Sequence, residues 1–146
     1  MGKIQASRYH DFSYGHRVHN HESKCANLHG HNGRVHFTIQ APELDVVGRV
    51  LDFSVIKSCL CEWIETHWDH KFLVWHNDPM AVKLAVLDPT VVEVPFNPTA
   101  ENMAKYLVEE VGPAQLARYE ATLVRVVIEE TRKCSCSYDR EDGSNE

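Results

Sequence analysis

The sequence predicts one domain of the α+β class, and three observations predict it. Segments near both ends of the chain alternate polar and apolar residues, a pattern typical of strands. Between them, residues 53–67 and 100–111 carry apolar side chains at helical spacing. The length of 146 residues fits a single domain with its own core and argues against two. The order strand, strand, helix, helix, strand, strand indicates an α+β architecture.

The first half of the chain is expected to form two strands and a helix. Residues 4–16 and 29–41 alternate with period two, and residues 17–28 between them are polar and irregular. The two strands are therefore expected to pair antiparallel around a loop. Asp52 is placed to cap the N-terminus of the helix at 53–67.

The middle of the chain is less regular. Residues 72–98 hold short apolar pieces broken by prolines, and residues 91–94 are the candidate for a short strand. Thr99 is placed to cap the second helix, residues 100–111. Gly112-Pro113 is expected to end that helix, because neither residue favours its continuation.

The C-terminal part is expected to add two strands to the sheet. Residues 121–131 form a long strand, and residues 134–138 form a short one. The side chains predicted to share one face of the long strand are Thr122, Val124, Val126, Ile128 and Glu130. Residues 139–146 are acidic and contain Gly and Ser, so they are expected to be a disordered tail after a domain that spans 1–138.

Composition and charge exclude several classes of function. The formal net charge is −6, which argues against generic nucleic-acid binding. No apolar run is long enough for a membrane span, and no apolar signal-peptide core follows Met1, so a cytoplasmic protein is expected. The five cysteines include no Cys-x-x-Cys, which favours free thiols in a reducing compartment.

Histidine is unusually dense, with six of the ten histidines between residues 16 and 36. His29 and His31 point to the same face if they lie on a strand, and Gly30 lets another group approach the backbone between them. Antiparallel pairing would bring His16 alongside this pair. Three imidazoles with an open fourth position are typical of a catalytic zinc site, whereas structural sites take four protein ligands and favour cysteine.

A surface location is the simpler interpretation for the other histidines of the N-terminal region. His10, His19 and His21 fit polar surface positions better than a metal site. His36 lies on the opposite face of the second strand and is not expected to be a ligand. A single His-x-His is weak by itself, but here the pair begins an otherwise apolar strand face.

Three further sites bear groups suited to proton transfer or to binding. Cys25 lies in a polar loop four residues before His29, where a thiol can serve as base or nucleophile, although a lone cysteine can also be inert packing. In Asp69-His70 a carboxylate can orient an imidazole, with pairing expected only through a turn; an ordinary helix end is the alternative. Glu130 ends an apolar strand face, so it either anchors a ligand with several N–H donors or has reached solvent.

The sequence resembles the family of 6-pyruvoyltetrahydropterin and 6-carboxytetrahydropterin synthases. Six segments in register carry the resemblance: Phe12-Ser13-Tyr14-Gly15-His16-Arg17, Lys24-Cys25-Ala26-Asn27-Leu28-His29-Gly30-His31, Val50-Leu51-Asp52-Phe53, Trp68-Asp69-His70-Lys71-Phe72-Leu73, Asn97-Pro98-Thr99-Ala100-Glu101-Asn102 and Glu130-Thr131. The resemblance implies the tunnelling fold (T-fold), with an antiparallel four-stranded sheet and two helices on one face. It also implies subunits that close β-barrels and pair into a homohexamer, a dimer of trimers with active sites between subunits.

The resemblance also implies roles for individual residues. The implied ligands of Zn²⁺ are His16, His29 and His31. Cys25 matches the catalytic cysteine, and Asp69 and His70 match its proton-relay partners. Glu130 matches the glutamate that anchors the pterin ring, and Thr99 lies in a segment that lines the pterin pocket.

The spacing Cys25-x-x-x-His29 resembles the bacterial 6-carboxytetrahydropterin synthases of queuosine (7-deazaguanine) biosynthesis. The implied activity is a zinc-dependent lyase that converts 7,8-dihydroneopterin triphosphate to 6-carboxy-5,6,7,8-tetrahydropterin, acetaldehyde and triphosphate. Two alternatives stay open: a 6-pyruvoyltetrahydropterin synthase acting on the same substrate, and a non-catalytic zinc-binding assembly module. Arg17 and Lys24 are candidates for a positive mouth that admits the triphosphate.

The chain departs from the family pattern in three places that bear on pocket shape. These are Tyr14-Gly15 before the first histidine, Gly33 in a stretch where relatives usually carry an aromatic residue, and a longer segment at residues 74–95.

Overall fold

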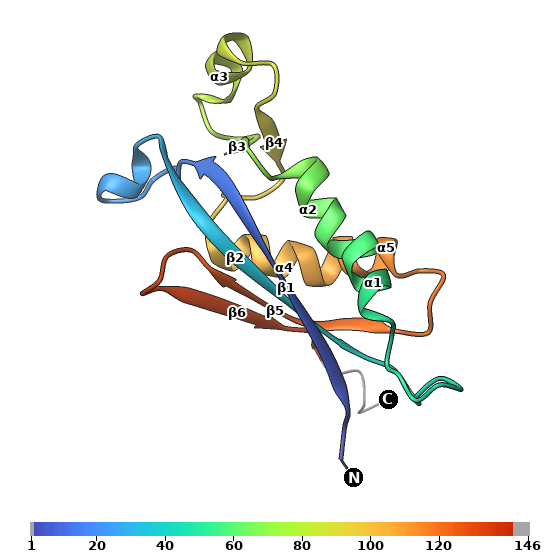
Figure 1. Ribbon diagram of the computed structural model, residues 1–146. Coiled ribbons are helices and arrows are strands. Elements are labelled where there is room, and N and C mark those ends of the chain that lie inside the picture. The colour runs from blue at the N-terminus through green and yellow to red at the C-terminus, as the bar shows by residue number, and fades with distance from the viewer. Residues whose placement is uncertain (1, 142–146) are drawn as a thin grey trace.

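The computed structural model describes residues 2–141 and contains one six-stranded sheet with the order β4-β3-β1-β2-β5-β6 (Figure 1). The strands are β1 (Gln5–His16), β2 (His29–Gln40), β3 (Lys71–Trp75), β4 (Val92–Val94), β5 (Thr122–Glu129) and β6 (Ser135–Asp139). Four strands, β1, β2, β5 and β6, pair antiparallel as predicted. The prediction of only four strands is wrong, because β3 and β4 extend the sheet in parallel beside β1.

The strand β3 is not predicted from the sequence, because polar and apolar residues do not alternate along it. Leu73 and Val74 are both completely buried, although they point to opposite faces of the sheet. A parallel strand covered on both faces reads as a short continuous apolar run, which periodicity alone does not distinguish from a piece of helix.

The first helical segment follows β2 and matches the predicted range of residues 53–67. It consists of α1 (Phe53–Ile56), a π-helical turn η2 (Lys57–Cys61) and α2 (Glu62–His67). The carboxylate of Asp52 accepts a hydrogen bond from Ser54 N–H over 2.8 Å, which confirms the predicted N-cap.

The second helical segment comprises α4 (Ala100–Tyr106), a π-helical turn η3 (Leu107–Val111) and α5 (Gly112–Gln115). The prediction that Gly112-Pro113 ends this helix is wrong, since the helix continues to Gln115. Gly112 N–H donates to Leu107 O, five residues earlier, so the helix is widened immediately before the proline. A wider turn relieves the clash that a proline ring makes with the preceding turn of a regular α-helix.

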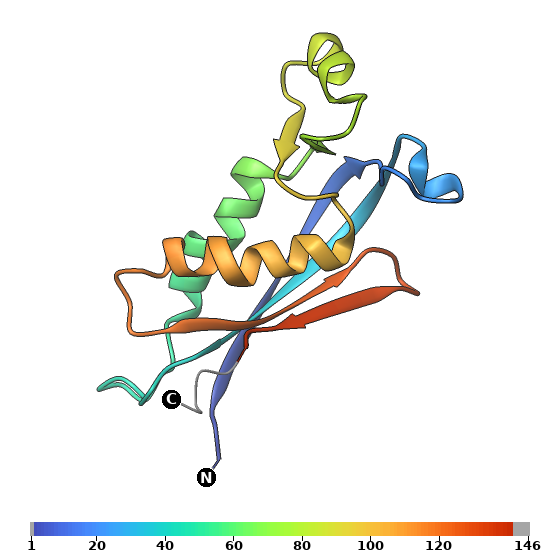
Figure 2. The same cartoon turned by 180° about the vertical axis from the view of Figure 1, so that it is seen from behind.

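The core lies between one face of the sheet and the two helical segments. Figure 2 shows α4 in front of the long strands when the molecule is viewed from behind. Side chains that are fully buried there come from both layers and include Phe37, Ile39, Val126 and Ile128 from the sheet and Ile56, Ile64, Met103 and Leu107 from the helices. Both helical segments therefore cover the same face, as the family resemblance implies.

The long strand β5 contains an irregularity that shifts its inward-facing residues. The register against β2 changes between Thr38 and Ile39, where Leu123 rather than Val124 is buried. The prediction that Thr122 and Val124 share the buried face with Val126 and Ile128 is therefore wrong, because an extra residue in a strand reverses its alternation.

One end of the sheet gathers several connections. The loop between β1 and β2 carries a short 3-10 turn, η1 (Lys24–Ala26), and the connection between β3 and β4 carries α3 (Ala81–Leu87). Figure 1 shows both connections beyond the end of β1. β1 ends there at His16, which is paired directly with His29 at the start of β2.

The remaining predictions concern the C-terminus, the cysteines and membranes. β6 ends at Asp139, one residue beyond the predicted domain boundary, and residues 142–146 of the predicted disordered tail lie outside the described residues. All five cysteines are free, as predicted. Within residues 2–141, the helices are too short or too polar to cross a membrane.

Candidate metal centre and active site

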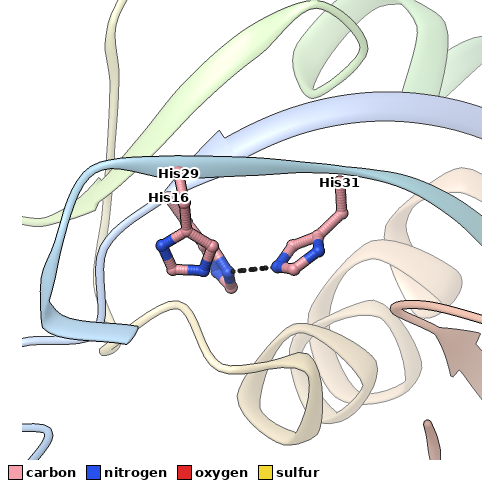
Figure 3. A group of neighbouring side chains, drawn as sticks. All are labelled: His16, His29 and His31. Atoms are coloured by element: carbon pink, nitrogen blue, oxygen red, sulfur yellow. Dashed lines mark hydrogen bonds between the residues drawn. The ribbon is translucent and has the colours of Figure 1, made fainter. Parts of the chain in front are cut away.

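His16, His29 and His31 meet on the helix-covered face of the sheet (Figure 3). One ring nitrogen from each of them lies within 4.8 Å of the others. The register of β1 against β2 produces this cluster, because His16 pairs with His29 and Tyr14 pairs with His31. The prediction that antiparallel pairing brings His16 alongside the His-x-His pair is confirmed, and the three side chains can hold a metal ion.

Gly30 provides the close approach that its position predicted. A Cβ atom at Gly30 would meet the carbonyl oxygen of Tyr14 at 3.1 Å. The absence of a side chain therefore lets β1 and β2 pair tightly between the two histidines of β2.

Backbone carbonyl groups orient two of the three imidazoles. His16 Nδ1 donates to Pro98 O over 2.6 Å, and His29 Nδ1 donates to Asn27 O over 2.7 Å. Because a carbonyl can only accept, both histidines carry their proton on Nδ1, which leaves Nε2 free as a ligand atom. Metal-binding histidines commonly have this outer-shell hydrogen bond, so the donor set fits a metal.

The third imidazole, that of His31, faces the first. His31 Nε2 lies 3.1 Å from His16 Nε2 (Figure 3). Burial lowers the pKa of His31 below its usual value, and the neighbouring His16 and His29 lower it further against the opposing effect of Glu130. A lowered pKa keeps this imidazole neutral, which is the form that binds metals.

Glu130 brings a carboxylate to the same cluster. Its Oε1 atom lies 3.3 Å from His16 Nε2 and 3.2 Å from His31 Nε2. The close contact with the imidazole of His16 lowers the pKa of Glu130 below its usual value and outweighs the effect of burial. Glu130 follows the end of β5 on the side of the buried Val126 and Ile128, so the carboxylate is paired rather than solvated.

The neighbouring carboxylate, Glu129, lies on the other face. Its Oε2 atom is 2.5 Å from His36 Nε2. His36 is thus separate from the histidine cluster, as the alternation along β2 predicts.

Cys25 lies in η1, within the loop that joins the two metal-site strands. Its side chain is neither in the core nor fully exposed, and its carbonyl oxygen accepts a hydrogen bond from Val18 N–H over 2.9 Å. Cys25 is not among the described side chains that pack in or against the main core, unlike Cys59, Cys61 and Cys136.

Asp69 and His70 form a second site at the edge of β1. Asp69 Oδ1 accepts from Ser13 N–H over 2.9 Å, and Ser13 O accepts from His70 N–H over 2.7 Å. Asp69 Oδ2 lies 2.8 Å from His70 Nδ1, so adjacent residues pair directly across the turn that follows α2. The pairing is possible because His70 adopts the left-handed conformation, with φ of 58°.

The carboxylate of Asp69 is anionic and orients the imidazole of His70. Burial raises its pKa, but the hydrogen bonds from Ser13 N–H and His70 outweigh this, and the pKa lies below the usual value. Among residues 2–141, no hydrogen bond or ion pair links Asp69 or His70 to the histidine cluster. The imidazole of His70 is 81% exposed.

Thr99 serves as a helix cap. Its Oγ1 atom accepts from Asn102 N–H over 3.1 Å at the start of α4, which confirms the predicted cap. The preceding residue, Pro98, provides the carbonyl group that orients His16. Thr99 therefore helps to hold the segment that contacts the cluster.

Two of the departures from the family pattern contact each other. A Cβ atom at Gly33 would meet Tyr14 Cε1 at 3.0 Å, so the Tyr14 ring fills the space beside this glycine. Tyr14 is 3% exposed, and its hydroxyl group has no hydrogen-bond partner within residues 2–141. Burial, together with the charge of Glu130, raises the pKa of this phenol, which therefore stays neutral and able to donate.

Two groups near the histidine cluster were not predicted from the sequence: a carbonyl that orients His16 and a carboxylate that pairs with Arg17. The Pro98 carbonyl could not be anticipated, because it lies 82 residues from His16 in sequence. Asp78 could not be anticipated either, since it lies in the irregular middle segment and meets Arg17 across 61 residues. Arg17 is wrong as a candidate for the positive mouth, because its guanidinium is paired with the Asp78 carboxylate.

Comparison with known proteins agrees with this geometry. The family described as 6-pyruvoyl tetrahydropterin synthase matches residues 5–141. A 6-carboxy-5,6,7,8-tetrahydropterin synthase from Rickettsia typhi is 34% identical over 134 residues, which cover 90% of this chain and 96% of that protein. The protein of the same name from Aquifex aeolicus is 33% identical over 131 residues, covering 82% of this chain and 78% of that protein.

Solved structures show the same architecture. An uncharacterized protein from Wolinella succinogenes matches with a TM-score of 0.84 and 23% identity over 97% of this chain and all of that chain (100%). The 6-pyruvoyl tetrahydropterin synthase of Caenorhabditis elegans matches with a TM-score of 0.66 and 25% identity over 97% of this chain and 98% of that chain. The predicted resemblance is confirmed: this chain has the tunnelling fold and belongs to the 6-pyruvoyl tetrahydropterin synthase family.

Proposed function

We propose that this chain is a zinc-dependent 6-carboxytetrahydropterin synthase, a lyase of queuosine biosynthesis. It converts 7,8-dihydroneopterin triphosphate and one water molecule to 6-carboxy-5,6,7,8-tetrahydropterin, acetaldehyde and triphosphate. The observation that carries the proposal is the cluster of His16, His29 and His31 with the Glu130 carboxylate beside it. Relatives named 6-carboxy-5,6,7,8-tetrahydropterin synthase at 34% and 33% identity support this product over others.

His16, His29 and His31 would hold the zinc ion through neutral imidazole nitrogens. Pro98 O and Asn27 O fix the rings of His16 and His29, so the ligand atoms are oriented before the metal arrives. A bound zinc ion supplies Lewis-acid chemistry, which makes protons next to the side-chain oxygens of the substrate easier to remove.

Proton transfer is assigned to the cysteine and the Asp–His pair. Cys25 as a thiolate takes a proton from the substrate side chain, and His70, oriented by Asp69, returns one. The exposed imidazole of His70 has no link to the histidine cluster of its own chain among residues 2–141. We therefore place Asp69 and His70 of one subunit against the Cys25 loop of a neighbouring subunit in a homohexamer.

Substrate binding is assigned to Glu130 and the segment around Thr99. An anionic carboxylate can accept two N–H bonds from the guanidine-like edge of a pterin ring. Its hydrogen bonds then fix the ring so that the side chain reaches the metal site, which contributes through orientation rather than through chemistry. The cap at Thr99 holds the adjacent wall of this pocket.

Product analysis tests the proposal directly. Purified protein incubated with 7,8-dihydroneopterin triphosphate is expected to release 6-carboxytetrahydropterin, acetaldehyde and triphosphate in equal amounts, measured by liquid chromatography with mass spectrometry. Cys25→Ala is expected to lower kcat by about 10²–10⁴ and to leave the zinc content unchanged. Full turnover by Cys25→Ala would contradict the assigned chemistry and favour another proton acceptor.

The second candidate function is 6-pyruvoyltetrahydropterin synthesis from the same substrate. The similarity to the Caenorhabditis elegans 6-pyruvoyl tetrahydropterin synthase favours it. A pyruvoyl product without acetaldehyde would establish this function in place of the first.

A further inference from the structure

The loop that carries Cys25 is fixed at its backbone by residues that directly follow a metal-site histidine. Val18 N–H donates to Cys25 O over 2.9 Å. Arg17 Nη1 donates to the next carbonyl, Ala26 O, also over 2.9 Å. Because Arg17 and Val18 are the first two residues after His16, these bonds tie the Cys25 backbone to the end of the strand that bears His16.

The other side of the loop is tied to the cluster in the same way. His29 Nδ1 donates to Asn27 O, so three consecutive carbonyl groups, those of residues 25–27, each have a donor. The position of Cys25 relative to the histidines thus depends on local hydrogen bonds rather than on burial of its side chain, which is only half-buried.

Arg17 is itself held by a buried carboxylate. Arg17 Nε donates to Asp78 Oδ2 over 2.6 Å, and the second oxygen of Asp78 accepts from Met80 N–H over 2.9 Å. The side chain of Asp78 is 0% exposed and that of Arg17 is 15% exposed. A buried ion pair of this kind fixes geometry, because removing one partner leaves the other charge unpaired in the interior.

Asp78 belongs to the connection between β3 and α3, within the long segment of residues 74–95. A second contact joins the same loop to the segment before α4. The side-chain amide of Asn97 accepts from His19 N–H over 3.1 Å and donates to His19 O over 2.9 Å. Two distant parts of the chain therefore immobilise residues 17–19, which in turn fix the backbone at Cys25.

We propose that Arg17 and Asp78 are positioning residues for Cys25. Asp78 fixes the guanidinium group of Arg17, and Arg17 fixes the Ala26 carbonyl, so that the loop bearing Cys25 is held to the end of the strand that bears His16. The inference rests on the proposed function, in which Cys25 takes a proton from the substrate. It also gives the long segment of residues 74–95 a role, since this segment supplies the carboxylate.

Two substitutions test the inference without removing either side chain. Asp78→Asn keeps the shape and removes the charge. Arg17→Lys keeps the positive charge, but a single ammonium group cannot reproduce the two guanidinium hydrogen bonds, one to Asp78 and one to Ala26 O. Each is expected to lower kcat by about 10-fold or more, with KM for 7,8-dihydroneopterin triphosphate and zinc per chain changed by less than about 2-fold.

The reactivity of Cys25 gives a readout that does not depend on turnover. Modification of Cys25 by iodoacetamide, followed by peptide mass spectrometry, is expected to become about 3-fold faster or more in both variants, because the loop opens more often. The double variant is expected to have about the same kcat as the less active of the two single variants, because both residues act through one contact.

Asp88→Asn is the matched control in the same connection. Among residues 2–141, the Asp88 carboxylate accepts hydrogen bonds only from Thr90, through N–H and Oγ1, and it makes none to residues 17–28. It is expected to keep wild-type kcat and wild-type modification of Cys25.

Unchanged kcat and unchanged Cys25 modification in both variants would overturn the inference, as would a loss of kcat that is matched by loss of zinc. If Asp78→Asn does not fold, Arg17→Lys decides by the same measurements. If wild-type protein does not convert the substrate, the proposed function fails, while the iodoacetamide rates still decide whether Arg17 and Asp78 position Cys25.

Discussion

The histidine cluster and the Asp69–His70 pair both depend on β1, but they are built in opposite ways. The cluster lies on the helix-covered face, where His16 is 1% exposed. The Asp69–His70 pair lies at the edge of the strand, and the imidazole of His70 is 81% exposed. Sheet register assembles the cluster from two strands, whereas a single turn assembles the pair.

The difference indicates what each region can do by itself. Within one chain the cluster has three ligand nitrogens, oriented outer N–H groups and a neighbouring carboxylate. The Asp69–His70 pair has an oriented imidazole, and within residues 2–141 no hydrogen bond or ion pair links it to the histidine cluster. A single subunit is thus expected to bind the metal, whereas proton transfer is expected to require groups from two subunits of the oligomer.

Removing a cluster histidine should have the largest effect. His29→Ala is expected to reduce zinc from about one per chain to a trace and to lower kcat by about 10³-fold or more, because a two-ligand site binds zinc weakly. Zinc is measured by inductively coupled plasma mass spectrometry on protein freed of loose metal. His36→Ala is the matched control, because this histidine is on the outer face of the same strand, and it should keep its zinc. Full zinc in His29→Ala would reject the site.

Mixing two inactive variants tests the contrast between subunit and assembly. Cys25→Ala and His70→Ala should each lose about 10²–10⁴ in kcat while keeping zinc. Co-expressed in equal amounts, they should recover about a quarter of wild-type activity, because random assembly unites an intact Cys25 with a neighbour's intact His70 in that fraction of sites. No recovery in mixed oligomers would mean that Cys25 and His70 act within one chain.

The smallest effect is expected from the pH dependence of the Asp69 contacts. The pKa of Asp69 is lowered in the folded state, so its stabilising contribution is complete above its usual value of 3.8 and is lost as pH falls through the lowered pKa. Asp69→Asn should reduce the free energy of unfolding by about 1–3 kcal/mol at pH 7. Urea unfolding at several pH values should show this difference shrinking below about pH 4.

Asp11→Asn is the comparison for that measurement. Asp11 also has a lowered pKa, through its hydrogen bond with Arg34, but its side chain is 61% exposed. Its replacement should therefore change stability less than Asp69→Asn at pH 7. An Asp69→Asn difference that stays constant down to pH 3 would show that the carboxylate charge does not contribute.

The histidine cluster could be predicted because its geometry follows from short-range rules. Strand periodicity places His29 and His31 on one face, and a short polar loop implies the hairpin that brings His16 to them. Asp52 and Thr99 were likewise predictable as caps, because a cap requires only the adjacent helix.

Features that depend on distant parts of the chain were not predictable in this way. The Asp78 carboxylate and the Pro98 carbonyl reach their partners only after the whole sheet has formed. The irregularity near Leu123 also carries no sequence signal, since both Leu123 and Val124 are apolar and either could face the core. In each case tertiary packing decides which residues meet or face the core, and local sequence patterns do not report on tertiary packing.

The backbone at His70 has a consequence for any attempt to engineer this protein. A left-handed conformation costs a residue with a side chain about 1–2 kcal/mol, and glycine avoids this cost. A redesign that optimised thermal stability alone would therefore favour glycine at position 70 and would remove the imidazole that Asp69 orients. Glycine at position 70 would therefore raise the stability of the fold and lower the proposed activity.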